Sequence, residues 1–102
     1  MSEYDEELAS DVWMKVRFET EHGRLTSYAV ALAVEEDGEW TTLRLYDNAH
    51  GAHEMHRYNR SGAKRSALVV HHGSSSEALN AAIAAVRDGF EEIVRVWRWG
   101  TR

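Results

Sequence analysis

Histidine and arginine side chains are concentrated in the middle of this chain, between residues 44 and 65, together with one aspartate, Asp47. Three of the six histidines lie there at intervals of three residues. Histidine titrates near neutral pH, binds metals and transfers protons, so histidines beside a carboxylate and several cations indicate catalysis or ligand binding. The candidate catalytic residues are Arg44, Asp47, His50, His53 and His56.

The first chemistry that these residues allow is metal binding. Neutral histidines can hold zinc or another divalent ion while one position stays open for water, and Asp47 could complete the ligand set or orient a ring. The chain has no cysteine, so histidine, carboxylates and water are the available ligands. Residues three apart on a strand point to opposite faces. His50 and His53 therefore converge only if residues 48–54 form a turn, which the asparagine and glycine in that segment favour.

The second chemistry needs no cofactor. One histidine abstracts a proton from a ribose 2′-hydroxyl, another protonates the leaving oxygen, and arginines stabilise the charged phosphorane. Arg44, Arg57 or Arg65 could supply that stabilising charge. The structural alternative is that the histidines are surface residues of a polar hairpin or hydrogen-bond partners in a connecting loop. All three interpretations stay open at this point.

A basic segment follows the histidines, and residues 55–76 contain no acidic side chain. Lysine and arginine without neighbouring carboxylates favour contact with phosphates, although a charged hairpin in water has a similar composition. The candidate nucleic-acid-binding residues are Arg57, Tyr58, Arg60, Lys64 and Arg65.

The chain divides into an acidic start and a charge-balanced domain. Its 102 residues fit one domain with a modest core. The net charge of −5 arises in residues 1–11, which carry no basic side chain, because the rest has as many acidic as basic residues. We expect residues 1–11 to form an acidic, frayed tail and residues 12–102 to form the domain. No stretch is long and apolar enough for a bilayer span or a signal peptide, so we expect a cytoplasmic protein.

Alternating apolar and polar residues predict a meander of three strands over residues 12–20, 26–35 and 40–47, joined by glycine-containing turns. The second turn has an Asp-Gly pair, which is a strong hairpin signal. Leu43 and Leu45 are expected to face inward together, since they are two residues apart on one strand.

Two shorter strands and a helix complete the predicted fold. The strands are expected over residues 54–58 and 64–71. Ser74 and Glu77 have the spacing of a capping box, and an apolar stripe follows them from Leu79 to Trp97. The sequence therefore predicts an α+β fold, an antiparallel meander of four to five strands with one C-terminal helix packed on one face.

Tryptophans occur on the other side of the predicted strands. Trp13 and Trp40 lie opposite the apolar residues of their strands. One helix covers one face of a sheet, so these aromatic side chains predict a homodimer or another protein partner. Stacking of nucleobases on the rings is the alternative.

The segment Arg44-x-Tyr46-Asp47-Asn48-x-His50 precedes two further histidines, a basic and aromatic strand and the helix. This pattern resembles the small prokaryotic TumE-like toxins and related domains with an Arg-Tyr-Asp-x-x-His-Gly core, over residues 40–97. TumE-like proteins are the toxic members of toxin–antitoxin pairs, typically encoded beside a helix-turn-helix antitoxin. The resemblance implies an antitoxin partner and a nucleic-acid or translation target. It points to Arg44, Tyr46, Asp47, His50, His53 and His56.

We therefore expect a toxin-like protein of a toxin–antitoxin pair that acts on RNA through its histidine and arginine cluster and is a candidate ribonuclease. The alternative is a non-enzymatic protein-binding or regulatory module that uses the aromatic sheet face. The RNA chemistry requires no cofactor, and a divalent metal is the alternative. The expected partners are an antitoxin protein, RNA and a second copy of the chain, with no membrane.

Overall fold

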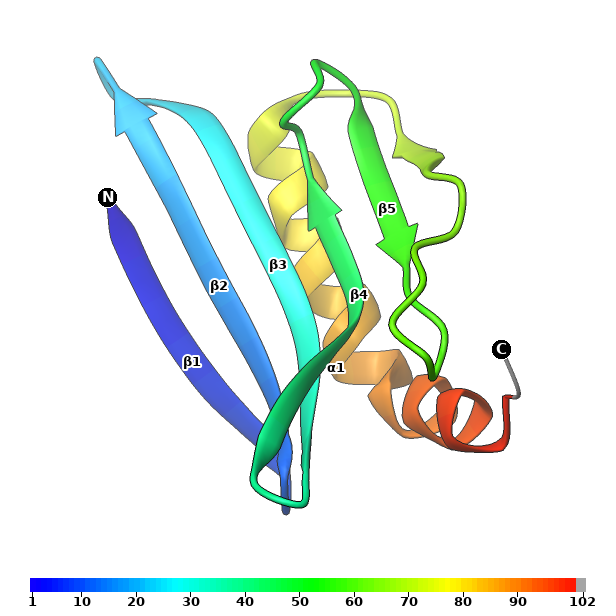
Figure 1. The fold of residues 1–102 in the computed structure, drawn as a ribbon. Coiled ribbons are helices and arrows are strands. Elements are labelled where there is room, and N and C mark those ends of the chain that lie inside the picture. Colours follow the sequence, from blue (N-terminus) through cyan, green and yellow to red (C-terminus); the bar gives the residue numbers. More distant parts are fainter. Residues whose placement is uncertain (101–102) are drawn as a thin grey trace.

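The computed structural model describes residues 1–100 and shows one antiparallel sheet with a helix on one face (Figure 1). The six strands follow one another across the sheet in chain order. The elements are β1 (Ser2–Ala9), β2 (Val12–Glu21), β3 (Arg24–Glu36), β4 (Glu39–Asp47), β5 (His53–Arg57), β6 (Leu68–His71) and α1 (Ser75–Trp99). The α+β class is confirmed, but the sheet has six strands where four or five were predicted.

The three longest strands, β2 to β4, form where the sequence alternates between apolar and polar residues. Met14 on β2 pairs with Leu32 on β3, and both side chains are fully buried beneath α1. The connecting turns have positive φ at His22 (53°) and Asp37 (54°), and each of these residues precedes a glycine that also has positive φ. Two consecutive residues at positive φ form the hairpin turn that matches the twist of paired strands. The expected three-strand meander is therefore confirmed.

The acidic start of the chain is an edge strand, whereas a frayed tail was expected over residues 1–11. β1 pairs antiparallel with β2 along most of its length. Glu6 reaches α1, where its Oε2 accepts a hydrogen bond from Nε of Arg87 at 3.0 Å and its Oε1 accepts one from Nη2 at 2.6 Å. Hydrogen bonding by Arg87 lowers the pKa of the Glu6 carboxyl below its usual value. The other acidic side chains of β1 discourage further strand pairing at this edge.

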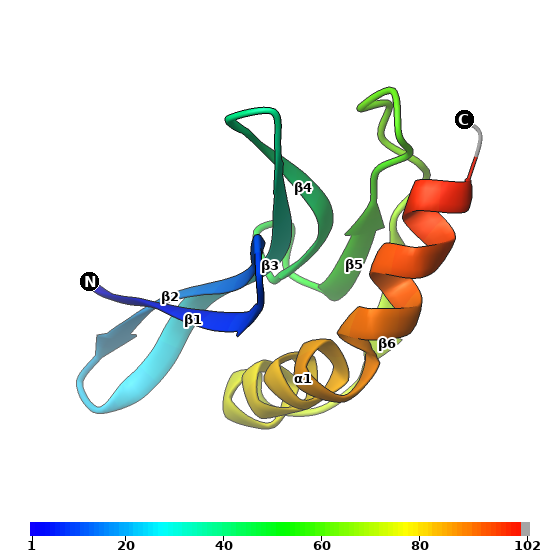
Figure 2. The ribbon, with the colours of Figure 1, turned by 90° about the horizontal axis from the view of Figure 1, so that it is seen from below.

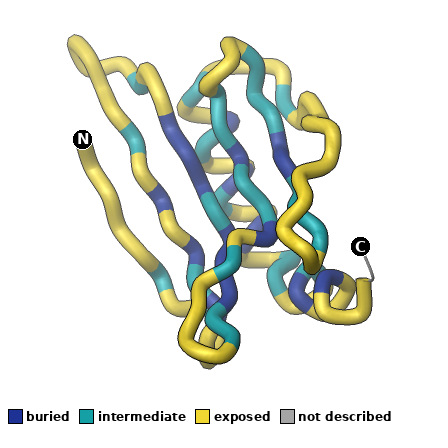
Figure 3. Tube along the Cα trace, in the orientation of Figure 1, coloured by how far each residue is buried: buried dark blue, intermediate teal, exposed yellow. Residues whose placement is uncertain are grey.

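The hydrophobic core lies between the sheet and α1 and appears as the dark blue part of Figure 3. Figure 2 shows that α1 covers one side of the sheet only. The buried core residues are Val12, Met14, Val16, Tyr28, Val30, Leu32, Val34, Leu43, Tyr46, Met55, Ala78, Ala82, Val86, Val94 and Trp97. The alanines of β3 alternate with these core residues and therefore face away from the helix.

A β-bulge in β4 separates two leucines that were expected to face the same side. The pairing with β3 shifts between Thr42 and Arg44, so Leu43 has no partner on β3. Leu43 enters the core and is 2 % exposed. Leu45 pairs with His56 on the face away from α1. The expected common orientation is wrong because the extra residue in a bulge breaks the alternation of side chains.

The helix begins at the predicted capping box. Oγ of Ser74 accepts a hydrogen bond from the backbone N of Glu77 at 3.1 Å, and Oε1 of Glu77 accepts one from the backbone N of Ser74 at 3.1 Å. The hydrogen bonds from Ser74 lower the pKa of the Glu77 carboxyl. The two halves of α1 run in different directions (Figure 2). Among residues 1–100, no helix is long and apolar enough to span a bilayer.

The segment after β4 forms β5 and β6, which lie at the opposite edge of the sheet from β1. Tyr58 forms a β-bridge with Lys64, as the predicted hairpin requires. The ladder then stops and resumes only at Leu68, so β6 is shorter than the strand predicted over residues 64–71. Three residues, 65–67, lie between Lys64 and Leu68, opposite two residues, 56–57, between Met55 and Tyr58. The extra residue interrupts regular pairing. Leu68 is 43 % exposed on this outer strand.

Candidate functional site

An arginine-lined pocket lies between the hairpin after β5 and the last turns of α1. Its volume is about 370 Å³, which is in the range of small-molecule sites. The lining residues are Leu43, Arg44, Arg57, Tyr58, Asn59, Arg60, Arg65, Glu92, Ile93, Val96, Trp97 and Gly100. Four of the five predicted nucleic-acid-binding residues line this pocket, together with Arg44, which was predicted as catalytic. The fifth, Lys64, is exposed and does not line it.

Backbone pairing brings the arginines of the pocket together. Arg57 ends β5 and pairs with Arg44 on β4. The backbone N of Arg65 donates a hydrogen bond to the carbonyl O of Arg57 at 2.8 Å. Within the hairpin, Oδ1 of Asn59 accepts a hydrogen bond from the backbone N of Ala63 at 2.9 Å. The asparagine therefore fixes the turn that carries the outer arginines.

Two carboxylates near the pocket already have arginine partners. Nη2 of Arg60 lies 3.3 Å from Oε1 of Glu36, and the same guanidinium lies 4.7 Å from the centre of the Trp97 ring. This is a cation–π contact, which holds Arg60 against the aromatic wall. Glu92, which also lines the pocket, is paired with Arg95 one turn along the helix. The Arg60–Glu36 pair is partly exposed and the Arg95–Glu92 pair is largely exposed, so neither adds much to stability.

The other three arginines of the pocket, Arg44, Arg57 and Arg65, form no ion pair within residues 1–100. Arg44 and Arg57 are directly opposite on neighbouring strands, where like charges are destabilising. Nε of Arg57 and Nε1 of Trp97 are also buried without a hydrogen-bond partner in the described residues. Each such donor is unfavourable by about 1–3 kcal/mol. A bound anion would reduce the repulsion and, with small side-chain movements, could accept hydrogen bonds from these donors.

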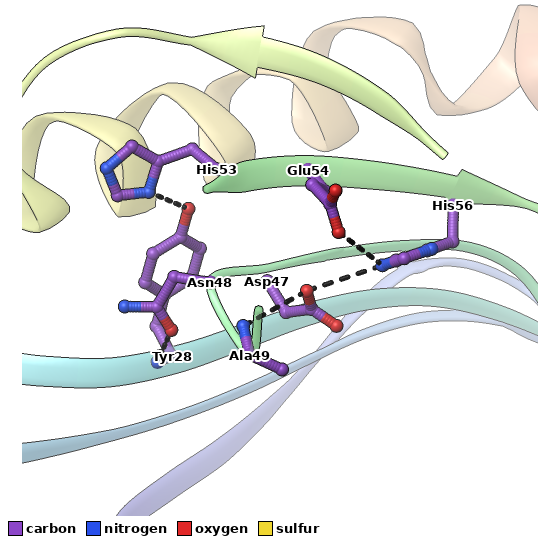
Figure 4. A network of polar contacts seen from close by, with 7 residues as sticks. All are labelled: Tyr28, Asp47, Asn48, Ala49, His53, Glu54 and His56. Carbon is purple, nitrogen blue, oxygen red and sulfur yellow. Dashed lines mark hydrogen bonds and ion pairs between the residues drawn. The ribbon is translucent and has the colours of Figure 1, made fainter. Parts of the chain in front are cut away.

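The predicted histidines do not meet at one point. His50 is exposed in the turn between β4 and β5. His53 lies on the helix side of β5, with Nε2 3.1 Å from the carbonyl O of Gly73 and Nδ1 2.9 Å from the hydroxyl of Tyr28 (Figure 4). A carbonyl only accepts hydrogen bonds, so the neutral ring carries its hydrogen on Nε2 and accepts from Tyr28 at Nδ1. His53 therefore connects β3 to the segment before α1.

The surroundings of His53 favour this structural role. Burial raises the pKa of the Tyr28 phenol, and the negative charge of Asp47 raises it further, so the phenol keeps its proton. The Tyr28 ring stacks on His53 with centroids 5.8 Å apart, and His71 meets His53 edge to face at 5.9 Å. Gly73 has a φ of 155°, and a Cβ there would lie 2.9 Å from Nε2 of His71. A glycine is required at this close approach.

His56 lies on the other side of β5 and is 3 % exposed. Its Nε2 lies 3.3 Å from Oδ1 of Asp47 and 3.8 Å from Oε1 of Glu54 (Figure 4). Asp47 and Glu54 pair directly across β4 and β5. These three residues could together hold a cation. Glu54 was not singled out from the sequence, although strand alternation places it on the same face as His56.

The structure thus distributes the predicted catalytic residues over two faces of β5. His53 and Arg57 share the helix side but lie four residues apart, roughly 13 Å along a strand. His56 is on the opposite face with Asp47. General acid and base must both reach the reacting group within hydrogen-bond distance. The arrangement brings no two of the predicted catalytic histidines, His50, His53 and His56, to one phosphate. It also does not bring His50, His53 and Asp47 to one metal ion.

Two further residues of the predicted motif have structural roles. Tyr46 belongs to the core and is 7 % exposed. Oδ1 of Asn48 accepts a hydrogen bond from the backbone N of Tyr28 at 3.2 Å, and its Nδ2 donates one to the carbonyl O of Thr26 at 3.1 Å. Asn48 therefore ties the turn after β4 to β3.

Trp97 is a pocket residue that sequence reasoning missed. It was predicted only as part of the helix stripe, and no local signal linked it to the arginines.

An aromatic pair occupies the sheet face away from α1, as predicted. Trp13 and Trp40 meet edge to face with centroids 6.3 Å apart. Nζ of Lys15 lies 5.4 Å from the centre of the Trp40 ring. Trp40 is 46 % exposed. The partner expected to cover this face stays a prediction.

The fold and both groups of side chains lie within one family domain. Residues 1–99 match the family described as a domain of unknown function, DUF7718. The chain belongs to the DUF7718 family. The match extends from β1 to α1, so the DUF7718 domain includes the arginines of the pocket and the histidines of β5. No curated protein and no solved structure matches the chain. Nothing in the DUF7718 match links the chain to TumE-like toxins, and that resemblance stays a prediction.

Proposed function

We propose that this protein binds single-stranded RNA through the arginine-lined pocket. The observation that carries the proposal is the convergence of Arg44, Arg57 and Arg65 on one cavity without ion-pair partners in the described chain. Guanidinium groups remain charged at physiological pH and bind phosphate oxygens through paired hydrogen bonds. A phosphodiester is therefore a suitable ligand for this pocket.

The apolar wall of the pocket favours a nucleotide over a simple phosphate ion. Ile93, Val96 and Trp97 line the side formed by α1. Unpaired bases of single strands stack on aromatic rings and arginine planes, whereas a duplex hides its bases. A volume of about 370 Å³ admits a single nucleotide unit more readily than a helix. The hydroxyl of Tyr58 supplies a hydrogen-bonding group for the ribose 2′-hydroxyl, the group that distinguishes RNA from DNA.

The proposed activity is RNA binding, and it does not include RNA cleavage. Among residues 1–100, no histidine lines the pocket. His53 holds Tyr28 and the carbonyl of Gly73, and His56 faces the other side of the sheet. The proposed binding needs no cofactor because the guanidinium groups themselves supply the positive charge.

The toxin-like role implied by the sequence resemblance is an extension of this proposal. It requires that the bound RNA is needed for growth and that an antitoxin partner prevents binding. Expression of the parent would then inhibit growth, and a variant that no longer binds RNA would not. Absence of inhibition would contradict the toxin role and leave RNA binding to be judged by its own assay.

The binding assay is fluorescence anisotropy with a labelled oligouridine of about ten nucleotides, which is within the usual footprint of single-strand binders. We expect saturable binding by the parent and weaker binding by Arg57→Gln. Arg24→Gln is the matched control, because Arg24 is exposed in the β2–β3 hairpin and does not line the pocket. Equal weakening by both substitutions would show nonspecific charge attraction, and unchanged binding by Arg57→Gln would contradict the proposal.

A further inference from the structure

The face of the sheet away from α1 holds a second group of ligand-type side chains, formed by Asp47, Glu54 and His56 (Figure 4). The His56 residue is 3 % exposed, and the side chains of Asp47 and Glu54 are 13 % and 20 % exposed. One donor atom from each residue lies within 4.8 Å of the other two. A buried ring nitrogen is therefore directed between two partly buried carboxylates.

This arrangement favours positive charge between the carboxylates. Asp47 and Glu54 are directly opposite on β4 and β5, where like charges destabilise the pair. Neither carboxylate has a lysine or arginine partner among residues 1–100. Partial burial strengthens their repulsion because the local dielectric is lower than that of water. Their shared neighbour is Nε2 of His56, which can hold either a proton or a metal ion.

We propose that Asp47, Glu54 and His56 bind one divalent transition-metal ion, with Zn²⁺ preferred. Bonds of about 2.1 Å to a tetrahedral ion place ligand atoms roughly 3.4 Å apart. The distances from Nε2 of His56 to the two carboxylate oxygens, 3.3 and 3.8 Å, are close to this spacing. Three protein ligands leave a fourth position for water or another ligand.

The donor types select among cations. An imidazole nitrogen with two carboxylate oxygens suits Zn²⁺ or Mn²⁺, whereas Mg²⁺ prefers oxygen ligands and keeps several waters. Zn²⁺ binds such sites more tightly than Mn²⁺ in the general order of divalent metals. Nδ1 of His56 has no hydrogen-bond partner in the described residues. Because the ring orientation then lacks the support that metal-bound histidines usually have, we expect weaker binding than in a fully supported site.

The ion would link β4 to β5 across the turn that carries His50. The unfolded chain does not present these three ligands together, so binding raises the apparent stability of the fold. The site lies on the opposite face of β5 from Arg57. The proposal is therefore independent of RNA binding, and either can fail without the other.

The test uses the full chain after treatment with a chelator. Isothermal titration calorimetry with Zn²⁺ should give one site per chain, with weaker Mn²⁺ binding and still weaker Mg²⁺ binding. Thermal unfolding with excess Zn²⁺ should show a raised midpoint. Glu54→Gln, which keeps the side-chain shape, should weaken Zn²⁺ binding at least tenfold. Asp47→Asn should have a similar effect and avoids substitution of the buried ring.

His72→Gln is the matched control, because His72 is an exposed histidine outside the group. It should leave the Zn²⁺ affinity unchanged. Three results would overturn the proposal: no single-site binding by the parent, binding unaffected by both carboxylate substitutions, or loss of binding in His72→Gln. Circular dichroism of each variant confirms that the fold is intact before the affinities are compared.

Discussion

Loss of one arginine from the pocket should change the salt dependence of RNA binding by a defined amount. Each phosphate contact with a single strand contributes about −0.7 to the slope of log affinity against log salt concentration. Arg44, Arg57 and Arg65 are the pocket arginines without ion-pair partners in residues 1–100. Three contacts give a slope of about −2.1, and Arg57→Gln should reduce it to about −1.4.

These slopes correspond to measurable differences in affinity. Between about 50 and 200 mM salt, the parent should lose roughly 18-fold in affinity and Arg57→Gln roughly 7-fold. Arg24→Gln should retain the parent's slope, because Arg24 lies in the distant β2–β3 hairpin. Anisotropy titrations at four salt concentrations give each slope. A parental slope near zero, or the same reduction in Arg24→Gln, would refute the assignment of these arginines to phosphate contacts.

Three further predictions concern residues outside the pocket. His53→Ala should lower the free energy of unfolding by about 1–3 kcal/mol, since Tyr28 and the carbonyl of Gly73 lose their hydrogen-bond partner. His50→Ala should change the free energy of unfolding by less than about 0.5 kcal/mol, and equal urea midpoints for the two variants would contradict this difference. Gly89→Ala should stabilise α1 by about 1 kcal/mol, because alanine favours the helix more than glycine does and an added Cβ meets one side-chain atom at an ordinary contact distance of 3.6 Å; a lower thermal midpoint would contradict this. Trp40→Glu should convert a dimer to a monomer in light scattering, and a monomeric parent would rule out the dimer.

The elements that the sequence predicted well are those with strong local signals. The apolar residues of β2 and β3 alternate with other side chains through the core, and Asp37 before glycine sets the hairpin between β3 and β4. The capping residues Ser74 and Glu77 fix the start of the helix without help from distant parts of the chain. Such elements are specified by neighbours in sequence.

The structure differs from the sequence-based expectations where contacts between distant parts of the chain determine the local conformation. β1 resembles a solvated tail in composition, but Glu6 gains Arg87 on α1, a partner 81 residues away. The bulge at Leu43 has no local signal, yet it reverses the side chains that follow. Both features depend on how the sheet packs, and the alternation of apolar and polar residues in the sequence does not describe that packing.

The candidate site was partly accessible to sequence reasoning. The absence of acidic residues between 55 and 76 identified three of the four arginines that line the pocket, Arg57, Arg60 and Arg65. Trp97 was not connected to them, because its position depends on where α1 docks. The spacing of the histidines indicated clustering, whereas strand geometry places His53 and His56 on opposite faces.

The most direct measurement of the central claim is an NMR titration that follows the indole N–H signals of the tryptophans during addition of single-stranded RNA. Trp97 lines the pocket, while Trp13 and Trp40 lie on the opposite sheet face and act as internal controls. RNA binding at the arginines predicts a progressive shift of the Trp97 signal, with Trp13 and Trp40 unchanged. An unchanged Trp97 signal at saturating RNA, or shifts confined to Trp13 and Trp40, would contradict the proposed site.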